Sequence, residues 1–302
     1  MRFDSYHPMI NFIYFAAAIA GAVLFTHPAF LAVSYLCAFF YSVKLNGKRA
    51  LIFNLCLIPL IFVYAGIYSY YNHFGVTSLG TNFIGNHITL ESVIYGLVIG
   101  IRAASVAMIF SCVFSVFSSD KVIYLFGKIS PKLSLFLSIL LRSVPRIKAR
   151  GKKISLARSG IGKGIGEGNL FTKIRNSLSV LSILITWTLE EFLESAASMK
   201  ARGYSLKGRT AFSIYRFDNR DRSFVITFFF CITITAGAVL LDQTNILYDP
   251  EIIMNRITPM SYFFYICYAF FLLLPLILQS VGEIRYNRMC ECSTISGGGE
   301  HV

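Results

Sequence analysis

Residues 90–118 read LESVIYGLVIGIRAASVAMIFSCVFSVFS, and this stretch decides the fold class of the protein. Glu91 and Arg102 are its only charged side chains. A helix needs roughly 20 mainly apolar residues to cross the hydrocarbon layer of a bilayer. The stretch meets that requirement, and we predict that it is a transmembrane helix.

The composition of the whole chain points the same way. Of its 302 residues, 55% are hydrophobic, and the mean hydropathy is +0.63, whereas soluble globular proteins have roughly 45–50% apolar residues. The run at 29–43 is short for a full crossing, which leaves open a tilted or interfacial helix or the return arm of a helical hairpin. The predicted fold class is all-α, a polytopic transmembrane protein with about six spans and long cytoplasmic helices. The expected spans are 9–25, 29–43, 51–71, 90–118, 224–241 and 261–281.

The basic residues predict the orientation in the membrane. The formal net charge is +13, and 20 of the 28 Lys and Arg residues lie within 119–222. The loop at 44–49 is also basic, whereas the loop at 72–89 has no Lys or Arg and the loop at 242–259 has one. Basic loops stay on the cytoplasmic side. We expect a multi-pass protein of the plasma membrane with both termini in the cytoplasm.

These patterns divide the chain into four parts. Residues 1–118 are expected to form an N-terminal transmembrane block of about four spans, and 119–222 a cytoplasmic or interfacial block of coupling helices. Residues 223–283 are expected to form a C-terminal transmembrane pair, followed by a cytoplasmic tail at 284–302. The basic middle block separates the two membrane blocks and is the best place for contact with a partner.

The middle block contains two amphipathic helices. The first begins at Pro131, a residue suited to a first helical turn, and has apolar and basic faces at helical spacing. Pro145 is expected to kink or interrupt it, and Gly160 to end it in a left-handed conformation. In the second helix, Leu178–Leu189 is apolar nearly all round yet too short to span. We expect that segment to be buried under the membrane block, Gly203 to close the helix, and three carboxylates to mark its exit to water: Glu190, Glu191 and Glu194.

Both helices are expected to end in an arginine between small residues. Arginine offers a planar fork of donors to carboxylates or carbonyl oxygens, and small neighbours let a helix end enter a groove. Two such tips would fit a paired plug on a partner. The alternative is that basic residues simply favour helix C-termini and cytoplasmic surfaces. The two candidate docking tips are Ala157, Arg158 and Ser159, and Ala201, Arg202 and Gly203.

With these motifs the chain resembles the T component of energy-coupling factor (ECF) transporters, the transmembrane scaffold of vitamin and metal-ion importers. The first motif ends in Ser159 rather than glycine, a variation that the family admits. The order of membrane block, coupling block and final spans also matches. The segments that carry the resemblance are Ser155–Gly160, Ser198–Gly208, Tyr6-His7-Pro8 with Asn11-Phe12 and Tyr14-Phe15, and Leu125–Arg146.

The resemblance implies a function without catalysis by this chain. In that family two cytoplasmic ABC-type ATPases bind and hydrolyse ATP, and the arginine motifs dock into grooves on them, which makes Arg158 and Arg202 the expected contacts. The coupling helices hold a small membrane-embedded substrate-binding subunit, the S component. The cargo, a vitamin, a metal ion such as cobalt or another micronutrient, is selected by that subunit. The resemblance therefore implies no enzyme activity and no cofactor in this chain, and contact with membrane lipid.

Other candidate sites are weaker. Gly96, Gly100 and Ala104 recur at four-residue spacing, which predicts a face of small residues for close helix packing. Arg102 lies off that face, inside the apolar run, and is either a functional polar site or the partner of a neighbouring helix dipole or polar side chain. The alternating glycines of 160–168 lack the phosphate-loop pattern and indicate a flexible linker. The histidines and cysteines show no metal-ligand spacing, so no metal site is expected. Basic charge beside membrane spans gives no reason to expect nucleic-acid binding.

Two other function classes remain open. A self-sufficient secondary carrier or channel would need inverted repeats and several polar residues within the spans. A membrane-embedded enzyme would need convergent Asp, Glu, His or Cys side chains at one membrane face. Neither pattern is evident in the sequence.

Overall fold

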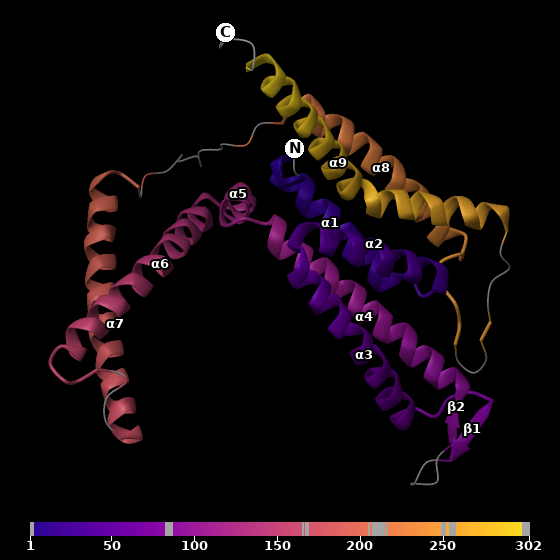
Figure 1. Ribbon diagram of the computed structural model, residues 1–302, viewed down its shortest axis with the longest axis horizontal. Coiled ribbons are helices and arrows are strands. Elements are labelled where there is room, and N and C mark those ends of the chain that lie inside the picture. Colours follow the sequence, from indigo (N-terminus) through magenta and orange to yellow (C-terminus); the bar gives the residue numbers. More distant parts are fainter. Residues whose placement is uncertain are drawn as a thin grey trace. The chain divides into compact units, whose positions relative to one another are not determined.

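The computed structural model describes residues 3–81, 87–164, 166, 169–204, 206, 215, 217–248, 252–253 and 258–297, and it is almost entirely helical (Figure 1). The chain forms two compact units. The membrane unit is Met1–Ser118 with Tyr215–Val302, and the coupling unit is Ser119–Ile214. The membrane unit contains a 3-10 turn at Phe3–Ser5, α1 (Pro8–Leu24), α2 (Pro28–Asn46), α3 (Lys48–Tyr71), β1 (Ser78–Thr81), β2 (His87–Thr89), α4 (Leu90–Val116), α8 (Asn219–Leu240) and α9 (Pro259–Gly297).

Five described helices are long and apolar enough to cross a membrane: α2, α3, α4, α8 and α9. The sequence predicted six spans and singled out 29–43 as the short one, whereas in the structure the short apolar helix is α1. Because α2 extends to 19 residues, it qualifies as a span, whereas α1, with 17 residues, falls below the usual length. The C-terminal segment also differs from a simple tail, because α9 continues to Gly297. It changes direction along its length (Figure 1) and contains Pro275, the residue type behind most sharp kinks.

α1 and α2 begin with the same His-Pro pair. In each case the proline is the first helical residue, where its missing N–H costs nothing. The histidine Nδ1 then accepts the N–H of the second helical residue, at 3.3 Å for His7 to Met9 and 3.2 Å for His27 to Ala29. These two histidines therefore start helices, a role that their position beside proline could have indicated.

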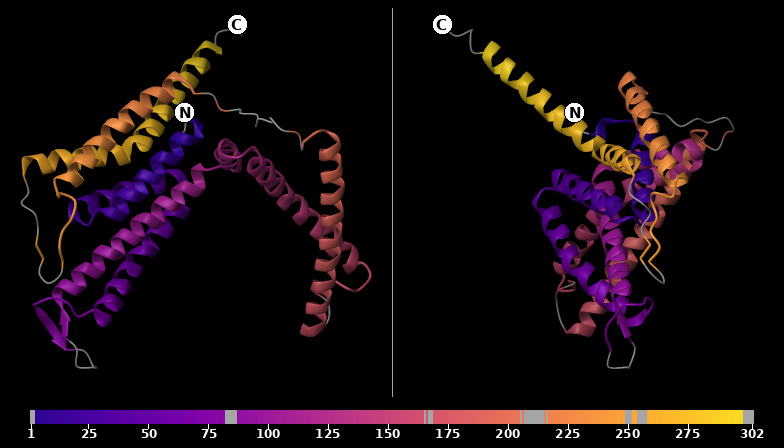
Figure 2. Two further views of the ribbon diagram at one scale, coloured as in Figure 1. Left: turned by 180° about the vertical axis from the view of Figure 1, so that it is seen from behind. Right: turned by 90° about the vertical axis from the view of Figure 1, so that its right-hand side faces the viewer.

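α3 and α4 pack side by side as an antiparallel hairpin, which both views of Figure 2 show. Glycines make the close approach possible. A Cβ on Gly96 would lie 3.1 Å from the Cα of Ala65, and one on Gly100 would lie 3.0 Å from Cγ2 of Ile61. This confirms the prediction that the small residues of α4 form a packing face. Such contacts matter in lipid, because close van der Waals packing, and not water exclusion, drives helix association there.

Aromatic rings fill the core between α1, α2, α8 and α9. Tyr268 is 1% exposed, and its hydroxyl lies 2.8 Å from Oγ of Ser34. The Tyr14 hydroxyl donates to the carbonyl of Leu272 at 3.0 Å. Edge and tilted ring contacts connect Phe3, Tyr14 and neighbours on the other helices. Tyr14 and Tyr268 thus keep hydrogen-bond partners in an apolar interior.

The loops of the membrane unit meet at its two ends. At one end the N–H groups of Thr26 and His27 donate to the carbonyl of Thr244, at 3.1 and 3.0 Å. An antiparallel hairpin of β1 and β2, which the sequence interpretation did not predict, joins α3 to α4 near the same end (Figure 1). At the other end Lys44 on α2 pairs with Glu283 on α9 at 2.6 Å.

The coupling unit consists of α5 (Ser119–Ile129), α6 (Pro131–Ser159) and α7 (Leu170–Ala201). α6 runs through Pro145 as one helix, so the interruption considered at that residue does not occur. Pro145 is exposed. The carbonyl that loses its helical N–H partner there is close to solvent, which reduces the cost of the break.

Candidate functional site

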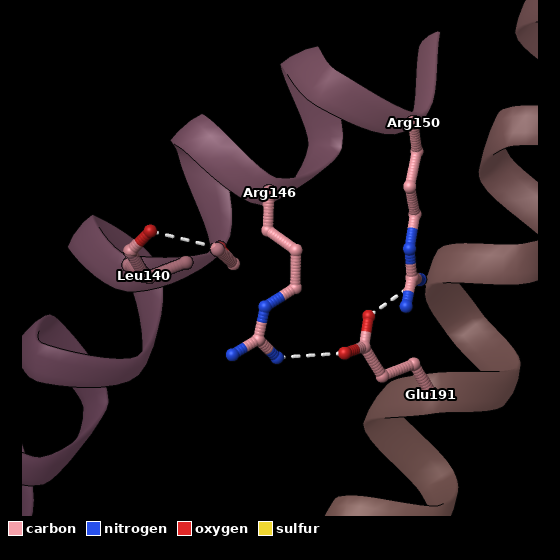
Figure 3. A network of polar contacts seen from close by, with 5 residues as sticks. Leu140, Arg146, Arg150 and Glu191 are labelled. Carbon is pink, nitrogen blue, oxygen red and sulfur yellow. Dashed lines mark hydrogen bonds and ion pairs between the residues drawn. The ribbon is translucent and has the colours of Figure 1, made fainter. Parts of the chain in front are cut away.

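A crossing clamp of three charged residues holds α6 to α7 (Figure 3). Nη1 of Arg146 lies 2.7 Å from Oε1 of Glu191, and Nη1 of Arg150 lies 2.6 Å from Oε2. Both carboxylate oxygens are therefore used, each by a different turn of α6. The hydrogen bond from Arg146, with the charge of Arg150, lowers the pKa of the Glu191 carboxyl. The clamp stays ionised through neutral pH.

Glu191 was predicted only to mark an exit to water. Its neighbours Glu190 and Glu194 are exposed, whereas Glu191 is partly covered and paired. The sequence did contain a signal, because Arg146 and Arg150 lie one turn apart on the same face of a helix. The sequence could not identify Glu191 as the partner, because it lies 45 residues further along the chain than Arg146.

Apolar contacts continue the crossing toward the end of α6. A Cβ on Gly151 would meet Cδ2 of Leu184 at 3.7 Å, an ordinary contact. Ile154 of α6 and Val180 of α7 are both buried. Residues with higher numbers on α6 contact residues with lower numbers on α7, so the two helices cross in antiparallel directions.

α6 ends at Ser159, beside Gly160 as predicted, but the left-handed residue comes two positions later than predicted. Gly160 is right-handed, with φ −62°, and the left-handed glycine is Gly162, with φ +70°. The N–H of Lys163 donates to the carbonyl of Arg158 and that of Gly162 to Ser159, both at 3.0 Å. This is the Schellman pattern, which needs the left-handed residue after the last turn. The prediction for Gly160 was wrong because the helical turn continues through it.

The tip of α7 has the same pattern. Gly203 closes the helix, as predicted, and it is left-handed, with φ +76°. Its N–H donates to the carbonyl of Lys200 at 3.1 Å, and the N–H of Tyr204 donates to Met199 at 3.2 Å. Both tips are therefore rigid helix ends with satisfied carbonyls.

The two arginines do not occupy equivalent places in these tips. Arg158 lies four residues before its left-handed glycine and is partly exposed, with Nε buried and without a hydrogen-bond partner among the described residues. Arg202 comes directly before its left-handed glycine and is exposed. The small residues beside them, Ala157, Ser159 and Ala201, are exposed as well. The two motifs thus have similar sequences but different geometry.

The tips lie apart within the coupling unit. The loop after α6 is fastened to the first half of α7, where Nδ2 of Asn176 donates to the carbonyl of Gly164 at 3.1 Å. Since a helix rises about 1.5 Å per residue, Arg202 lies about 39 Å from Asn176 along α7. The structure does not bring Arg158 and Arg202 together into one plug.

The α7 apolar segment, Leu178–Leu189, has exposed side chains. Leu178 is 60% exposed, and Trp187, the only tryptophan of the chain, is 53% exposed. Monomeric soluble proteins rarely leave such a contiguous apolar surface uncovered. Burial of this segment under the membrane helices stays a prediction.

Arg102 is partly exposed on α4, and its Nε and Nη2 are buried without a hydrogen-bond partner among the described residues. No group of three or more His, Cys, Asp or Glu side chains able to hold a metal ion occurs in the part of the chain that the structure describes.

Comparison with known proteins gives the family resemblance a second basis. The chain is 33% identical over 110 residues to the energy-coupling factor transporter transmembrane protein EcfT 1 of Listeria monocytogenes, which covers 36% of this chain and 40% of the relative. About a third of this chain is thus similar to EcfT proteins. The EcfT protein of Lactococcus lactis is 32% identical over 97 residues, covering 32% and 36% of the two chains, and that of Lacticaseibacillus paracasei is 35% identical over 91 residues, covering 30% and 34%. No protein-family model matches the chain.

The EcfT-like match has a limited extent. The chain spans about two-fifths or less of the length of these curated relatives. A protein of Mycoplasma pneumoniae without an assigned function is also 30% identical over 115 residues, covering 36% of this chain and 26% of that protein. The match agrees with the resemblance stated from the motifs and with a multi-pass membrane protein.

Proposed function

We propose that this chain is the transmembrane scaffold subunit of an ECF-type importer. In this role it connects two cytoplasmic ABC-type ATPases to a membrane-embedded S component that binds a vitamin, metal ion or other micronutrient. The observation that carries the proposal is the coupling unit: two rigid, arginine-bearing tips and an exposed apolar segment on one pair of crossed helices. The EcfT-like sequence match supports the same role.

The separation of the tips favours two docking sites over one. Arg158 and Arg202 lie at opposite ends of the crossed pair, so each would enter a groove on a different ATPase subunit. The exposed Ala157, Ser159 and Ala201 leave room for a groove wall to approach the helix backbone. Arginine would then make the charge-assisted contacts that fix each tip.

The crossing clamp gives this arrangement a way to transmit motion. ATP binding would move the two docked tips relative to each other. Because Glu191 fastens α6 to α7 at their crossing, the helices would pivot there and not separate. The α7 apolar segment would carry the motion to the S component, whose toppling would deliver the substrate inward. Both termini and the coupling unit would lie on the cytoplasmic side.

The test is co-purification of the tagged full-length chain from its native membrane, followed by mass spectrometry. Wild type is expected to recover ATP-binding-cassette subunits and a small membrane protein. The double variant Arg158→Glu with Arg202→Glu is expected to lose the ATPases. The matched control, Arg142→Glu with Lys148→Glu, reverses two exposed charges on α6 away from the tips and is expected to keep them.

Two outcomes would contradict the proposal. Loss of the ATPases from the control as well would show a general charge effect and no specific docking. Recovery of the chain alone, in wild type and variants, would favour a self-sufficient carrier or a membrane-embedded enzyme.

A further inference from the structure

Two cavities on the α3–α4 hairpin meet at Ala107, and together they form one groove, called here the hairpin groove. The cavity nearer the start of α3 has a volume of about 570 Å³, and the other has about 260 Å³. The residues that line the first cavity include Phe53, Phe110 and Phe114, with the polar Asn46, Ser111 and Ser115. Those that line the second include Leu57, Leu60 and Tyr64 of α3 and Gly100 and Ala103 of α4.

The length of the hairpin groove fits half of a membrane. On α3 its lining side chains recur every three or four residues from Phe53 to Tyr64, which places them on one face of the helix. A helix rises about 1.5 Å per residue, so this stripe is about 16 Å long. One leaflet, half of a hydrocarbon layer of about 30 Å, is about 15 Å deep. The groove therefore has the length of an acyl chain in one leaflet.

Two basic residues lie at the end of the groove nearest the start of α3. Arg49 precedes Phe53 by one helical turn and continues the same stripe, and Lys48 is its neighbour. Both are exposed, and neither has an ion pair among the described residues. Arg49 lies about 6 Å before Phe53 along the axis. The two charges thus lie at the start of the span, where lipid headgroups lie, while the apolar groove runs into the hydrocarbon layer.

The start of α3 favours an anion for two further reasons. Its cap, Gly47, supplies no side-chain hydrogen bond to the first N–H groups. The positive end of the helix dipole lies there as well, so two cations in the first turn are unfavourable without an anion beside them. The polar lip of the groove adds donors, because Oγ of Ser111 accepts from Nδ2 of Asn46 at 3.3 Å and keeps its own proton for a ligand oxygen.

We propose that the hairpin groove binds an anionic phospholipid. One acyl chain lies along the stripe from Phe53 to Tyr64, and the phosphate lies at Lys48 and Arg49. A transmembrane helix of another protein fits less well, because it would need a wall along the whole hydrocarbon layer of about 30 Å, and the groove has about half that length. The site lies in the membrane unit and does not depend on the proposed scaffold function.

The experiment is native mass spectrometry of the delipidated full-length chain, incubated with equal amounts of dioleoylphosphatidylglycerol and dioleoylphosphatidylcholine. Wild type is expected to retain the anionic phosphatidylglycerol in preference. Lys48→Gln with Arg49→Gln is expected to lower that retention about thirtyfold, since each basic residue beside an anionic headgroup contributes roughly fivefold. The matched control, Arg285→Gln with Arg288→Gln, is expected to keep it.

The control removes two exposed arginines on α9, a helix that contributes no residue to the groove. They follow Glu283, which pairs with Lys44 near the same end of the membrane unit. The control thus removes the same charge at the same end of the unit. It separates binding at the groove from a general attraction of basic residues to anionic lipid.

Three further arms test the acyl chain and the source of the phosphate. Ala103→Phe fills the apolar half of the groove at an exposed alanine and is expected to weaken retention, whereas Ala16→Phe, at an exposed alanine on α1, is expected to keep it. Dihexanoylphosphatidylglycerol, whose chains are too short to fill the groove, is expected to be retained less than the dioleoyl lipid. Soluble glycerol phosphate is expected not to displace the lipid.

The proposal is overturned if Lys48→Gln with Arg49→Gln retains phosphatidylglycerol as wild type does, or if the α9 control loses it to the same extent. Unchanged retention in Ala103→Phe, or equal retention of the dihexanoyl lipid, would show that the groove does not hold the acyl chain. Displacement by glycerol phosphate would identify a soluble phosphate ligand and overturn the lipid assignment.

Discussion

The two units of this protein place their apolar side chains in different ways. In the membrane unit, rings such as Phe30 and Tyr268 are buried against other helices. In the coupling unit, Leu178 and Trp187 are exposed, and a charged clamp holds the helices together. The membrane unit has a packed ring core of its own, and its outer surface exposes further apolar side chains such as Phe114, which is 80% exposed. The coupling unit presents surfaces that only another molecule can cover.

The first prediction breaks the packing of the membrane unit. Gly96→Leu places a side chain where a Cβ alone would lie 3.1 Å from backbone atoms of Ala65, so α3 and α4 must separate. We expect a loss of about 3 kcal/mol in the free energy of unfolding, measured by denaturant titration in detergent. Gly66→Leu, on α3 with no atom within 4 Å of the added Cβ, is the control. An equal loss at Gly66 would contradict the packing explanation.

The coupling unit should respond differently to the same kind of change. Gly151→Ala adds a methyl group that meets only the Leu184 side chain, at 3.7 Å. Replacing glycine inside a helix by alanine stabilises it by up to about 1 kcal/mol. We therefore expect no loss of stability from Gly151→Ala in the same titration. A loss would show that the crossing is as tightly packed as the α3–α4 hairpin.

A smaller effect is expected from one buried hydroxyl. Tyr268→Phe removes the hydroxyl that lies 2.8 Å from Ser34 and leaves the rings in place. Loss of a hydrogen bond costs about 1 kcal/mol in the free energy of unfolding. Tyr262→Phe, at a tyrosine that is 59% exposed, is expected to be neutral in the same measurement. Equal values for the two variants would mean that the buried hydroxyl contributes nothing.

The clamp of the coupling unit is expected to depend on pH. Because Arg146 and Arg150 lower the pKa of Glu191, the clamp stabilises the crossing above the ordinary carboxyl range and is lost as the pH falls through the lowered value. Distances between spin labels on α6 and α7 should broaden over that interval in wild type. Glu191→Gln should show the broad distribution at neutral pH, whereas Glu194→Gln should behave as wild type. A narrow distribution in Glu191→Gln would show that apolar contacts alone hold the crossing.

The sequence predicted those features that depend on local pattern. Apolar runs gave the membrane helices, and the spacing of Gly96 and Gly100 gave the packing face of α4. The end of α7 was predicted from a single residue, Gly203. The clamp could not be predicted, because the partner of Arg146 is distant in the chain. The left-handed glycine after α6 was misplaced for a related reason: several glycines follow Arg158, and only the hydrogen bonds of Lys163 and Gly162 decide which one is left-handed.

The smallest effect on stability is expected at Trp187, where the contrast between the units is sharpest. Trp187→Ala removes a large side chain, yet that side chain is 53% exposed, so the free energy of unfolding should change by no more than about 0.5 kcal/mol. If the α7 apolar segment is a partner surface, the same variant should reduce recovery of the small membrane protein in co-purification while keeping the ATPases. Large stability loss with unchanged recovery would mean that Trp187 is a packing residue of this chain. An exposed apolar side chain that matters for assembly and not for folding is what distinguishes a docking surface from a core, and this one residue can separate the two.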